Sequence, residues 1–296
     1  MSDYVILADS TCDLGKALRK KYDIGYVQMN YVIDDKEYPA DLDWGIHSCH
    51  EFYDLMRGGK RVRTTQVARE TYVKEFKKHL DEGKDIVYIA CSSALSGSIN
   101  LAMLIARELE EEYPGRKLYC IDSLCSSLGQ GSMVIRAAEM RAAGKPADEV
   151  AKAIEETKLK VNQCGTVDSM EYLRRAGRIK ASKAFFGNLF GIKPLIISDC
   201  IGQNYAFKKV KGALTAKKEI AAHIAENVEN AEGQCLYLTH ADVPESVEQL
   251  KDEILKVAPF ASVHIEPIGP IVGASVGPGT IIAFCYGKEV TIEGKE

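Results

Sequence analysis

DIVYIACSSALSGSIN, residues 85–100, is the stretch that decides the fold class. Its apolar run at 86–90 is rich in strand formers, hydroxyl side chains and a glycine follow, and an apolar segment of helical length occupies 99–109. The pattern predicts a strand, a turn and a helix. In a parallel sheet the carboxyl end of a strand and the amino end of the next helix face one crevice, so we expect a ligand at this turn.

Hydroxyl groups dominate the predicted turn, which carries Ser92, Ser93, Ser96 and Ser98. The free N–H groups of the helix start favour an anionic ligand, and Gly97 lets a ligand approach the backbone closely. A purely structural interpretation is also open, because Ser96 or Ser98 can cap the helix. The residues of this turn do not decide between binding and capping.

Two other turns repeat this chemistry ahead of predicted helices. They are DSTCD at 9–13 and RTTQ at 63–66. Asp, Ser and Thr at such junctions satisfy free helix N–H groups, which explains both turns without any ligand. The alternative is that they line the same crevice and donate hydrogen bonds to an oxygen-rich ligand.

Strand and helix patterns alternate through the first half of the chain. Buried-type strands are predicted at 4–8 and 116–122, each followed by a turn and a helix, and two further strands, at 26–32 and 36–38, flank the turn at Asp34 and Asp35. This alternation predicts an α/β fold with a mostly parallel sheet flanked by helices. With about 150 residues as a usual domain size, we assign residues 1–160 to a first domain.

The pattern changes in residues 161–296, which we assign to a second α/β domain with a mixed sheet. The basic run YLRRAGRIK at 172–180 is either a solvated surface or a docking patch for an acidic partner or a phosphate. AFFGNLFGI at 184–192 is apolar on nearly all sides, so it is buried or faces an apolar ligand. The glycine-rich turn at 269–279 is expected to hold Ser275 on a tight loop with free amide groups.

Composition restricts the classes of function. The 296 residues are 46% hydrophobic and contain no run near the ~18 apolar residues of a membrane span, and the first apolar run is too short for a signal peptide. A net charge of −4 disfavours nucleic acid as the main partner. The nine cysteines form no C-x-x-C pair and mostly lie in apolar runs, so we expect reduced thiols and a cytoplasmic protein.

A metal site is not expected, although His47, Cys49 and His50 lie close together. Their spacing matches no zinc pattern, and no second cluster of ligands occurs elsewhere. The S-x-x-E sequence from Ser48 to Glu51 is a capping box and explains the polar residues between them. We expect no cofactor either.

Five motifs in order along the chain resemble the DegV family. They are DSTCDL at 9–14, TTQVA at 64–68, LSGSIN at 95–100, YLRRAGRI at 172–179 and GPIVGASVGPG at 269–279. The resemblance covers essentially the whole chain and implies a two-domain α/β protein that holds one long-chain fatty acid between its domains, with no catalysis of its own. Some members present the acid to a separate fatty acid kinase, so the resemblance implies that partner too.

The resemblance also implies which residues bind the carboxylate. The family's hydroxyls fall on Thr64, Thr65 and Ser96, to which we add the neighbouring Gly97 and, from the glycine-rich turn, Ser275. Members of the family usually carry a His in that turn, and this chain has Ser275 instead. TTQVA also departs from the commoner TSQPS pattern, although its first three positions keep their donors.

The basic run and the apolar second half supply the remaining candidates. Arg174, Arg175 and Arg178 match the part of the family thought to meet the kinase or the new phosphate. The candidates for the apolar wall that contacts the fatty acid tail are Phe185, Phe186, Leu189, Phe190, Ile268, Ile271 and Val276. Each of them is explained equally well as a residue of the ordinary hydrophobic core.

Two other classes of function remain open as alternatives. A serine hydrolase or phosphotransferase acting on a small lipid or anionic substrate needs a base beside its nucleophile, yet no G-x-S-x-G elbow occurs and none of the six histidines lies in a suitable turn. A nucleotide-binding module lacks its glycine fingerprint. The sequence therefore favours a non-catalytic binding protein.

Overall fold

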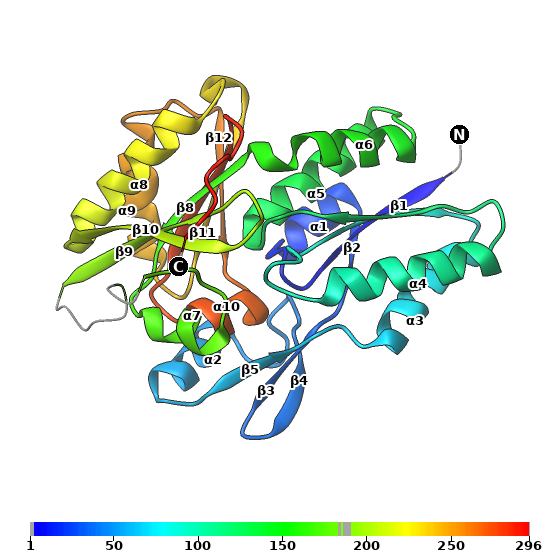
Figure 1. Cartoon of the computed structure of the whole chain (residues 1–296), viewed down its shortest axis with the longest axis horizontal. Helices are drawn as coiled ribbons and strands as arrows, with labels where there is room; N and C mark the ends of the chain where they lie inside the picture. Colours follow the sequence, from blue (N-terminus) through cyan, green and yellow to red (C-terminus); the bar gives the residue numbers. More distant parts are fainter. Residues whose placement is uncertain (1–2, 183–184, 186–190, 296) are drawn as a thin grey trace.

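The computed structural model describes residues 3–182, 185 and 191–295, and these residues form three sheets (Figure 1). The first is a four-stranded parallel sheet in which every residue of the central strand β6 is buried. Such burial on both faces is what the apolar run at 86–90 predicts. The strand order of this sheet is β2 (Ile24–Val27), β1 (Tyr4–Asp9), β6 (Asp85–Ala90), β7 (Leu118–Asp122).

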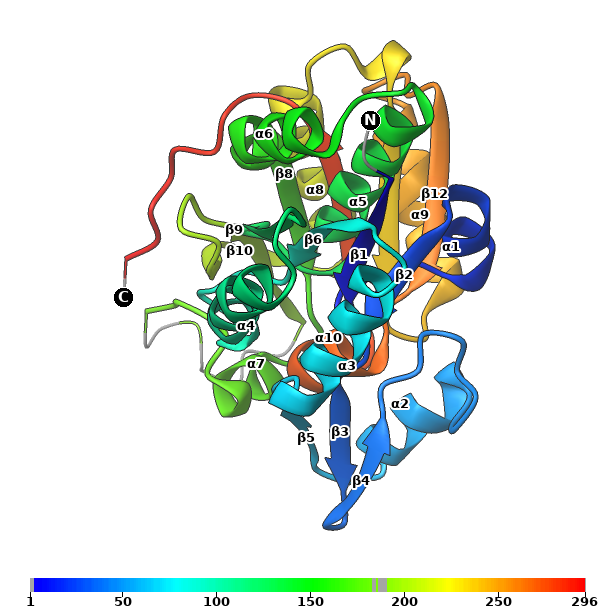
Figure 2. The ribbon, with the colours of Figure 1, turned by 90° about the vertical axis from the view of Figure 1, so that its right-hand side faces the viewer.

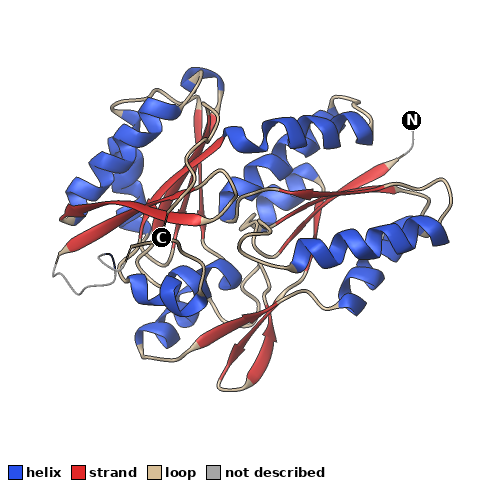
Figure 3. Cartoon of the chain, in the orientation of Figure 1, coloured by secondary structure: helices blue, strands red, loops and turns tan. Residues whose placement is uncertain are grey.

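Helices cover both faces of the parallel sheet (Figure 3). On one face lie α3 (Arg69–Leu80) and α4 (Ser98–Glu112), and on the other lie α1 (Lys16–Tyr22), α5 (Ser127–Ala142) and α6 (Ala147–Thr157). The strand, turn and helix expected within residues 85–109 are confirmed as β6 and α4.

A three-stranded antiparallel sheet projects from the lower side of the molecule in Figure 1. Its order is β4 (Lys36–Pro39), β3 (Asn30–Ile33), β5 (Val62–Thr65). The hairpin predicted at Asp34 and Asp35 is confirmed, and both residues have the positive φ that such a turn requires. α2 (Cys49–Arg57) follows this hairpin and begins with the predicted capping box.

The second half forms a six-stranded mixed sheet, antiparallel except for the pair β11 and β12. α8 (Ala213–Asn227) and α9 (Pro244–Leu255) pack on this sheet, and the short helices α7 (Met170–Ala176) and α10 (Pro270–Val276) contact each other. Two 3-10 turns occupy Lys158–Lys160 and Ala231–Gly233. The strand order is β10 (Asn204–Lys211), β9 (Ile192–Ser198), β8 (Val161–Thr166), β13 (Ile281–Tyr286), β11 (Cys235–His240), β12 (Ser262–Pro267).

Helix α5 joins the two halves, because it packs against β1 and β6 of the parallel sheet and against β8, β11 and β13 of the mixed sheet (Figure 2). Its glycines allow this close approach. A Cβ atom at Gly129 would lie 2.9 Å from the ring of Phe284, and one at Gly131 would lie 2.6 Å from the carbonyl oxygen of Cys12. One buried apolar cluster therefore extends through both halves, and the division at residue 160 stays a prediction.

Three expectations about local structure were wrong. The predicted strand at 26–32 is two strands in different sheets, β2 and β3. The turn at 63–66 is largely strand β5, which pairs with β3. The glycine-rich turn contains helix α10, which begins with Pro270 at its first position, where a missing N–H costs nothing.

Candidate functional site

A cavity opens where the turn after β6, the strand β5 and the helix α10 meet. The open space inside it is about 690 Å³, with the solvent at its mouth included. Four of the five residues predicted to bind the carboxylate line it together, namely Thr64, Thr65, Ser96 and Ser275. The structure thus brings together side chains from positions more than two hundred residues apart in sequence.

Ser96 is placed to donate a hydrogen bond into the cavity. Its Oγ atom lies 3.0 Å from Oγ of Ser98, and Ser98 Oγ already accepts the N–H of Val67 at 3.3 Å. In the structure the Ser96 hydroxyl donates to Ser98 Oγ and accepts the N–H of Ser98 at 3.3 Å. Because hydroxyl hydrogens rotate to suit their partners, Ser96 can turn its hydrogen to a ligand oxygen when one is bound. Gly97 is the N-cap residue of α4, and the Ser96 hydroxyl accepts the N–H of Ser98, the first residue of the helix, so Ser96 also satisfies a free N–H of the helix start.

Thr64 and Thr65 differ in what their hydroxyls do. Consecutive residues of a strand point to opposite faces, and both lie in β5. The Thr65 hydroxyl donates to the carbonyl oxygen of Asn30 (3.4 Å) and to Glu37 (3.3 Å). Thr64 makes no side-chain hydrogen bond within the described residues, and it also borders the outer pocket described below. Thr64 is therefore the better candidate for a ligand contact.

Gly97 does not line the cavity. The side chain of Gln66 lies over it, so that a Cβ atom at position 97 would be 2.7 Å from Gln66 Nε2. Gly97 therefore makes room for Gln66, which does line the cavity, rather than for a ligand. Sequence reasoning had named Gln66 only as part of the turn at 63–66.

Ser275 lies in the last turn of α10, so its surroundings are not the loop of free amides that we expected. The N–H of Gly273 donates to Gly269 O and the N–H of Gly277 donates to Gly273 O, which uses these amides within the helix. Ser275 still lines the cavity. Its contribution is a side chain, not a nest of backbone donors.

Arg178 is the one charged residue among the described residues that line the cavity. Its Nε donates to the carbonyl oxygen of Leu95 (2.9 Å) and its Nη1 to that of Ala176, with no carboxylate partner in the described chain. Sequence reasoning placed Arg178 only on a docking patch. The structure adds a guanidinium with an unneutralised positive charge beside the hydroxyls.

Buried Asp9 holds two further segments of the lining in place. Its carboxylate accepts hydrogen bonds from the N–H and hydroxyl of Thr11 and from the N–H of Cys91 (2.9 Å), and Tyr88 and Gln130 donate to it as well. Thr11 and Cys91 both line the cavity, which confirms the alternative that the turn at 9–13 faces the crevice. Burial raises the pKa of Cys91, so its thiol stays neutral.

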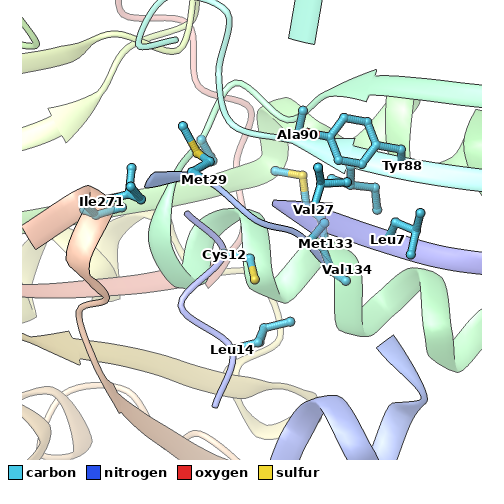
Figure 4. Close-up of a cluster of buried hydrophobic side chains, with 14 of the residues drawn as sticks. Leu7, Cys12, Leu14, Val27, Met29, Tyr88, Ala90, Met133, Val134 and Ile271 are labelled. Atoms are coloured by element: carbon cyan, nitrogen blue, oxygen red, sulfur yellow. The ribbon is translucent and has the colours of Figure 1, made fainter. Parts of the chain in front are cut away.

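A second, inner cavity of about 260 Å³ adjoins the first. The two share Gln163, Asn204, Val276 and Ile282, and the inner one is bordered further by Val167, Leu173 and Ile196. Met29, between β2 and β3, lies beside Ile271 of α10 and adds apolar surface to the first cavity (Figure 4). Mostly apolar side chains thus border the space that adjoins the hydroxyl groups.

The predicted tail residues divide into three groups. Ile271 and Val276 line the cavity. Ile268 is fully buried but does not line the cavity, and its carbonyl oxygen accepts a hydrogen bond from Tyr53. Phe185 does not line the cavity either, and Nζ of Lys209 lies 4.9 Å from the centre of its ring. Phe186, Leu189 and Phe190 lie outside the described residues.

An outer pocket adjoins the mouth and shares Thr64, Arg178 and Ser275 with the cavity. The described residues that line it include no carboxylate and five cations, which are Lys60, Arg61, Arg63, Arg175 and Arg178. Lys60 and Arg63 form ion pairs with Asp34 and Asp35 outside the lining. Arg174 is not among them and forms an ion pair with Glu171, as Arg175 also does. Sequence reasoning missed the three cations at 60–63, because nothing in the sequence places β5 beside α7.

A possible metal-binding group in the described chain consists of His50, Asp54 and Asp242. Arg57 forms ion pairs with both carboxylates, at 2.7 Å to Asp54 and 2.6 Å to Asp242. The guanidinium therefore neutralises one of the two carboxylate charges, and His50 also contacts both carboxylates. The cluster ties α2 to the loop after β11 and lies away from the cavity.

Comparison with known proteins identifies the chain. The model of the DegV family, described as "Uncharacterised protein, DegV family", matches residues 3–288. The chain belongs to the DegV family. A DegV domain-containing protein of Clostridium perfringens is 34% identical over 287 residues, which cover 97% of this chain and 98% of that one. The family resemblance inferred from five short motifs is thereby confirmed.

Two solved DegV structures share the fold. A DegV lipid binding protein of Thermotoga maritima has a TM-score of 0.85 at 26% identity, covering 98% of this chain and all of that one. A DegV family protein of Thermus thermophilus, described by its fatty acid binding, has a TM-score of 0.86 at 27% identity, covering 97% of this chain and 100% of that one. The predicted α/β class is confirmed by this DegV fold.

None of the helices in the described part of the chain combines the length and the apolar character needed to cross a bilayer. All nine cysteines are free thiols.

Proposed function

We propose that this protein binds one long-chain fatty acid without transforming it. The observation that carries the proposal is the cavity itself, in which the hydroxyls of Thr64, Ser96 and Ser275 and the guanidinium of Arg178 lie beside a space that mostly apolar side chains border. The carboxylate would lie among these donors and the tail would run inward. Both related DegV structures described above are characterised as lipid or fatty acid binding.

The donors suit a carboxylate because burying this charge requires several hydrogen bonds. Most of the affinity would come from the tail, at roughly 0.8 kcal/mol per buried CH₂ group, or on the order of 11 kcal/mol for about fourteen of them before ordering costs. The headgroup contacts would then fix the orientation of the acid. Neutral hydroxyls with one cation suffice for that task.

An enzymatic role has less support from the same residues. A serine hydrolase needs a base within hydrogen-bonding reach of its nucleophile. Among the described residues that line the cavity, none is a His, Asp or Glu, and the buried thiol of Cys91 has a raised pKa. Ester turnover by the purified protein that Ser96→Ala abolishes would favour the hydrolase instead.

The direct test is to identify what the protein carries. Protein purified under native conditions is extracted with organic solvent, and the extract is analysed by mass spectrometry. We expect about one equivalent of long-chain fatty acid, or uptake of one equivalent after the protein is stripped and incubated with hexadecanoic acid. A protein that neither carries nor takes up acyl chains contradicts the proposal.

We further propose that the outer pocket serves transfer of phosphate to the bound carboxylate by a separate kinase. Arg61 and Arg178, which have no carboxylate partner among the described residues, and Arg175 would meet the phosphate or the acidic surface of the kinase. We expect Arg61→Met to bind fatty acid normally and to support less acyl phosphate formation by a bacterial fatty acid kinase. Arg174→Met, outside the pocket, is the matched control, and equal loss in both variants argues against this role.

A further inference from the structure

The inner cavity has a wall of its own. Of the described residues, six line it without lining the first cavity, and they are Gly165, Thr166, Val167, Leu173, Ile196 and Thr280. The three with bulky apolar side chains, Val167, Leu173 and Ile196, are at most 5% exposed. A tail that passes the four residues shared by both cavities would therefore meet closely packed hydrocarbon.

Leu173 differs from the rest of this wall because it comes from a helix, whereas the others lie in or next to strands of the mixed sheet. It is the buried residue of α7, with 1% of its surface exposed. Tyr172, Arg175 and Ala176 of the same helix line the outer pocket instead. Helix α7 thus borders the inner cavity with one side chain and the outer pocket with three.

Several contacts hold α7 in place. The hydroxyl of Tyr172 donates to the carbonyl oxygen of Met56 (3.3 Å), and the ring of Tyr172 packs so closely on Gly277 that a Cβ atom there would collide with it. The N–H of Arg178 donates to the carbonyl oxygen of Leu173 itself (3.1 Å). Leu173 therefore cannot move away from the inner cavity without breaking these contacts.

A fixed headgroup and a fixed wall together measure the length of a chain. In the proposed function the carboxylate is held by the donors of the first cavity, so the number of carbon atoms decides how far the tail reaches. Each CH₂ group that leaves water for the cavity tightens binding about fourfold. A chain that is too long must leave its last groups in water or pull the carboxylate from its donors, so the gain stops there.

We propose that Leu173 sets the longest acyl chain that the protein accepts, because its side chain closes the inner cavity against the end of the tail. This inference rests on the proposed fatty acid binding and names the residue that determines specificity within it. The preferred ligands are unbranched acids whose last carbon reaches Leu173, and longer chains gain no affinity.

The first test uses the wild-type protein, stripped of lipid. Its dissociation constants are measured by titration calorimetry for unbranched saturated acids from decanoic to icosanoic acid. We expect the affinity to rise about fourfold with each added CH₂ group and to stop rising at one chain length. An affinity that still rises at icosanoic acid shows that no wall limits the chain and overturns the inference.

Leu173→Ala removes three carbon atoms from the wall. We expect acids too short to reach position 173 to bind as they bind to the wild type, and the limiting chain length to increase by about two to three carbons. Leu18→Ala is the matched control, because Leu18 is also buried in a helix of seven residues, α1, and lines neither cavity. An unchanged limit in Leu173→Ala overturns the inference.

A milder variant keeps the test valid if Leu173→Ala does not fold. Leu173→Val removes one carbon atom and should raise the limit by about one carbon. A loosened fold would weaken the binding of acids of every length, whereas a change in the wall alters the binding of the long ones alone.

The outcomes also separate this inference from the proposal on which it rests. Acids that bind with a limit that neither variant moves leave the proposed function intact and refute the role of Leu173. Absence of binding for acids of every length refutes both.

Discussion

Oδ1 of Asp13 lies 2.9 Å from the backbone nitrogen of Gly269, although the two residues are 256 positions apart in the chain. Asp13 follows β1, and Gly269 is the N-cap of α10, the helix that carries Ser275. The hydroxyl of Ser127 at the start of α5 donates to the other carboxyl oxygen at 2.5 Å. One buried carboxyl therefore connects the first half, the central helix and the binding helix.

The pH dependence of stability should report on Asp13. Burial raises its pKa from 3.8 to about 7, although the hydrogen bonds from Ser127 and Gly269 act in the opposite direction. The folded chain then holds a proton on Asp13 between about pH 4 and pH 7, where the unfolded chain has lost it. We therefore expect the contribution of Asp13 to the free energy of unfolding to be highest below pH 4, to fall by the order of 4 kcal/mol as the pH rises to 7, and to level off above.

Asp13→Asn isolates this contribution. An amide can still accept the N–H of Gly269 and approach Ser127, and it does not titrate. Urea unfolding of both proteins from pH 4 to pH 8 should show a flatter profile for the variant and a relative gain in its stability toward pH 8. Parallel profiles for the two proteins would mean that Asp13 does not titrate in this range.

Sequence reasoning located the site where local patterns were strong. The alternation of strand and helix predicted the parallel sheet. The position of a turn at the carboxyl end of β6 predicted that Ser96 faces the crevice, and Ser96 does line the cavity. Thr64 was indicated by the hydroxyls of RTTQ at 63–66 and by the family resemblance, although its strand was predicted as a turn. Strand β5 is four residues long, half of them exposed, and contains a cation, so its pattern resembles a loop.

Tertiary contacts explain what the sequence could not show. Three glycines within 269–277 argue against a helix by propensity, yet α10 forms because it packs against α7 and the buried Tyr53. Gln163 and Asn204 lie in strands, where a polar residue usually marks the solvent face. Only the packing of α5 and α10 over the sheet reveals that these amides face a cavity.

Removing either of two cavity hydroxyls should weaken fatty acid binding. Thr64→Val and Ser96→Ala each leave the buried carboxylate short of a donor, so we expect a loss of ~1–3 kcal/mol in binding free energy. Thr65→Val is the control, because that hydroxyl is already bonded to Asn30 O and Glu37. Calorimetric titration with hexadecanoic acid measures all three, and a larger effect for Thr65→Val would place the headgroup elsewhere.

Gly273→Ala should destabilise the fold through α10. A Cβ atom at position 273 would collide with the hydroxyl of Tyr53, which is buried and donates to the carbonyl oxygen of Ile268 (2.7 Å). Overpacking of this kind typically costs ~1–3 kcal/mol. In urea unfolding, the double variant with Tyr53→Phe should lose less free energy of unfolding than the sum of the losses in the two single variants. Additive effects would show that α10 accommodates the methyl group by another route.

Arg178→Met should separate recognition of the ligand's charge from recognition of its tail. The guanidinium borders the cavity beside the hydroxyls and is held only by the carbonyl oxygens of Leu95 and Ala176, so it is free to pair with a carboxylate. A hydrogen bond to a charged group is worth ~1.5–3 kcal/mol, and hexadecanol has no such charge. We therefore expect the variant to bind hexadecanoic acid roughly 10-fold to 150-fold more weakly than the wild type does. Its affinity for hexadecanol should equal that of the wild type.

Arg174→Met controls for the loss of positive charge from α7, because Arg174 pairs with Glu171 and does not line the cavity. It should bind both ligands normally at low and at high salt. The difference between acid and alcohol is the informative quantity, since an indirect effect on folding would weaken both ligands equally. If Arg178→Met weakens the binding of acid and alcohol equally, Arg178 has a structural role at the mouth of the cavity, where it connects α7 to the turn after β6. The carboxylate would then be bound by the hydroxyls of Thr64, Ser96 and Ser275 without this cation.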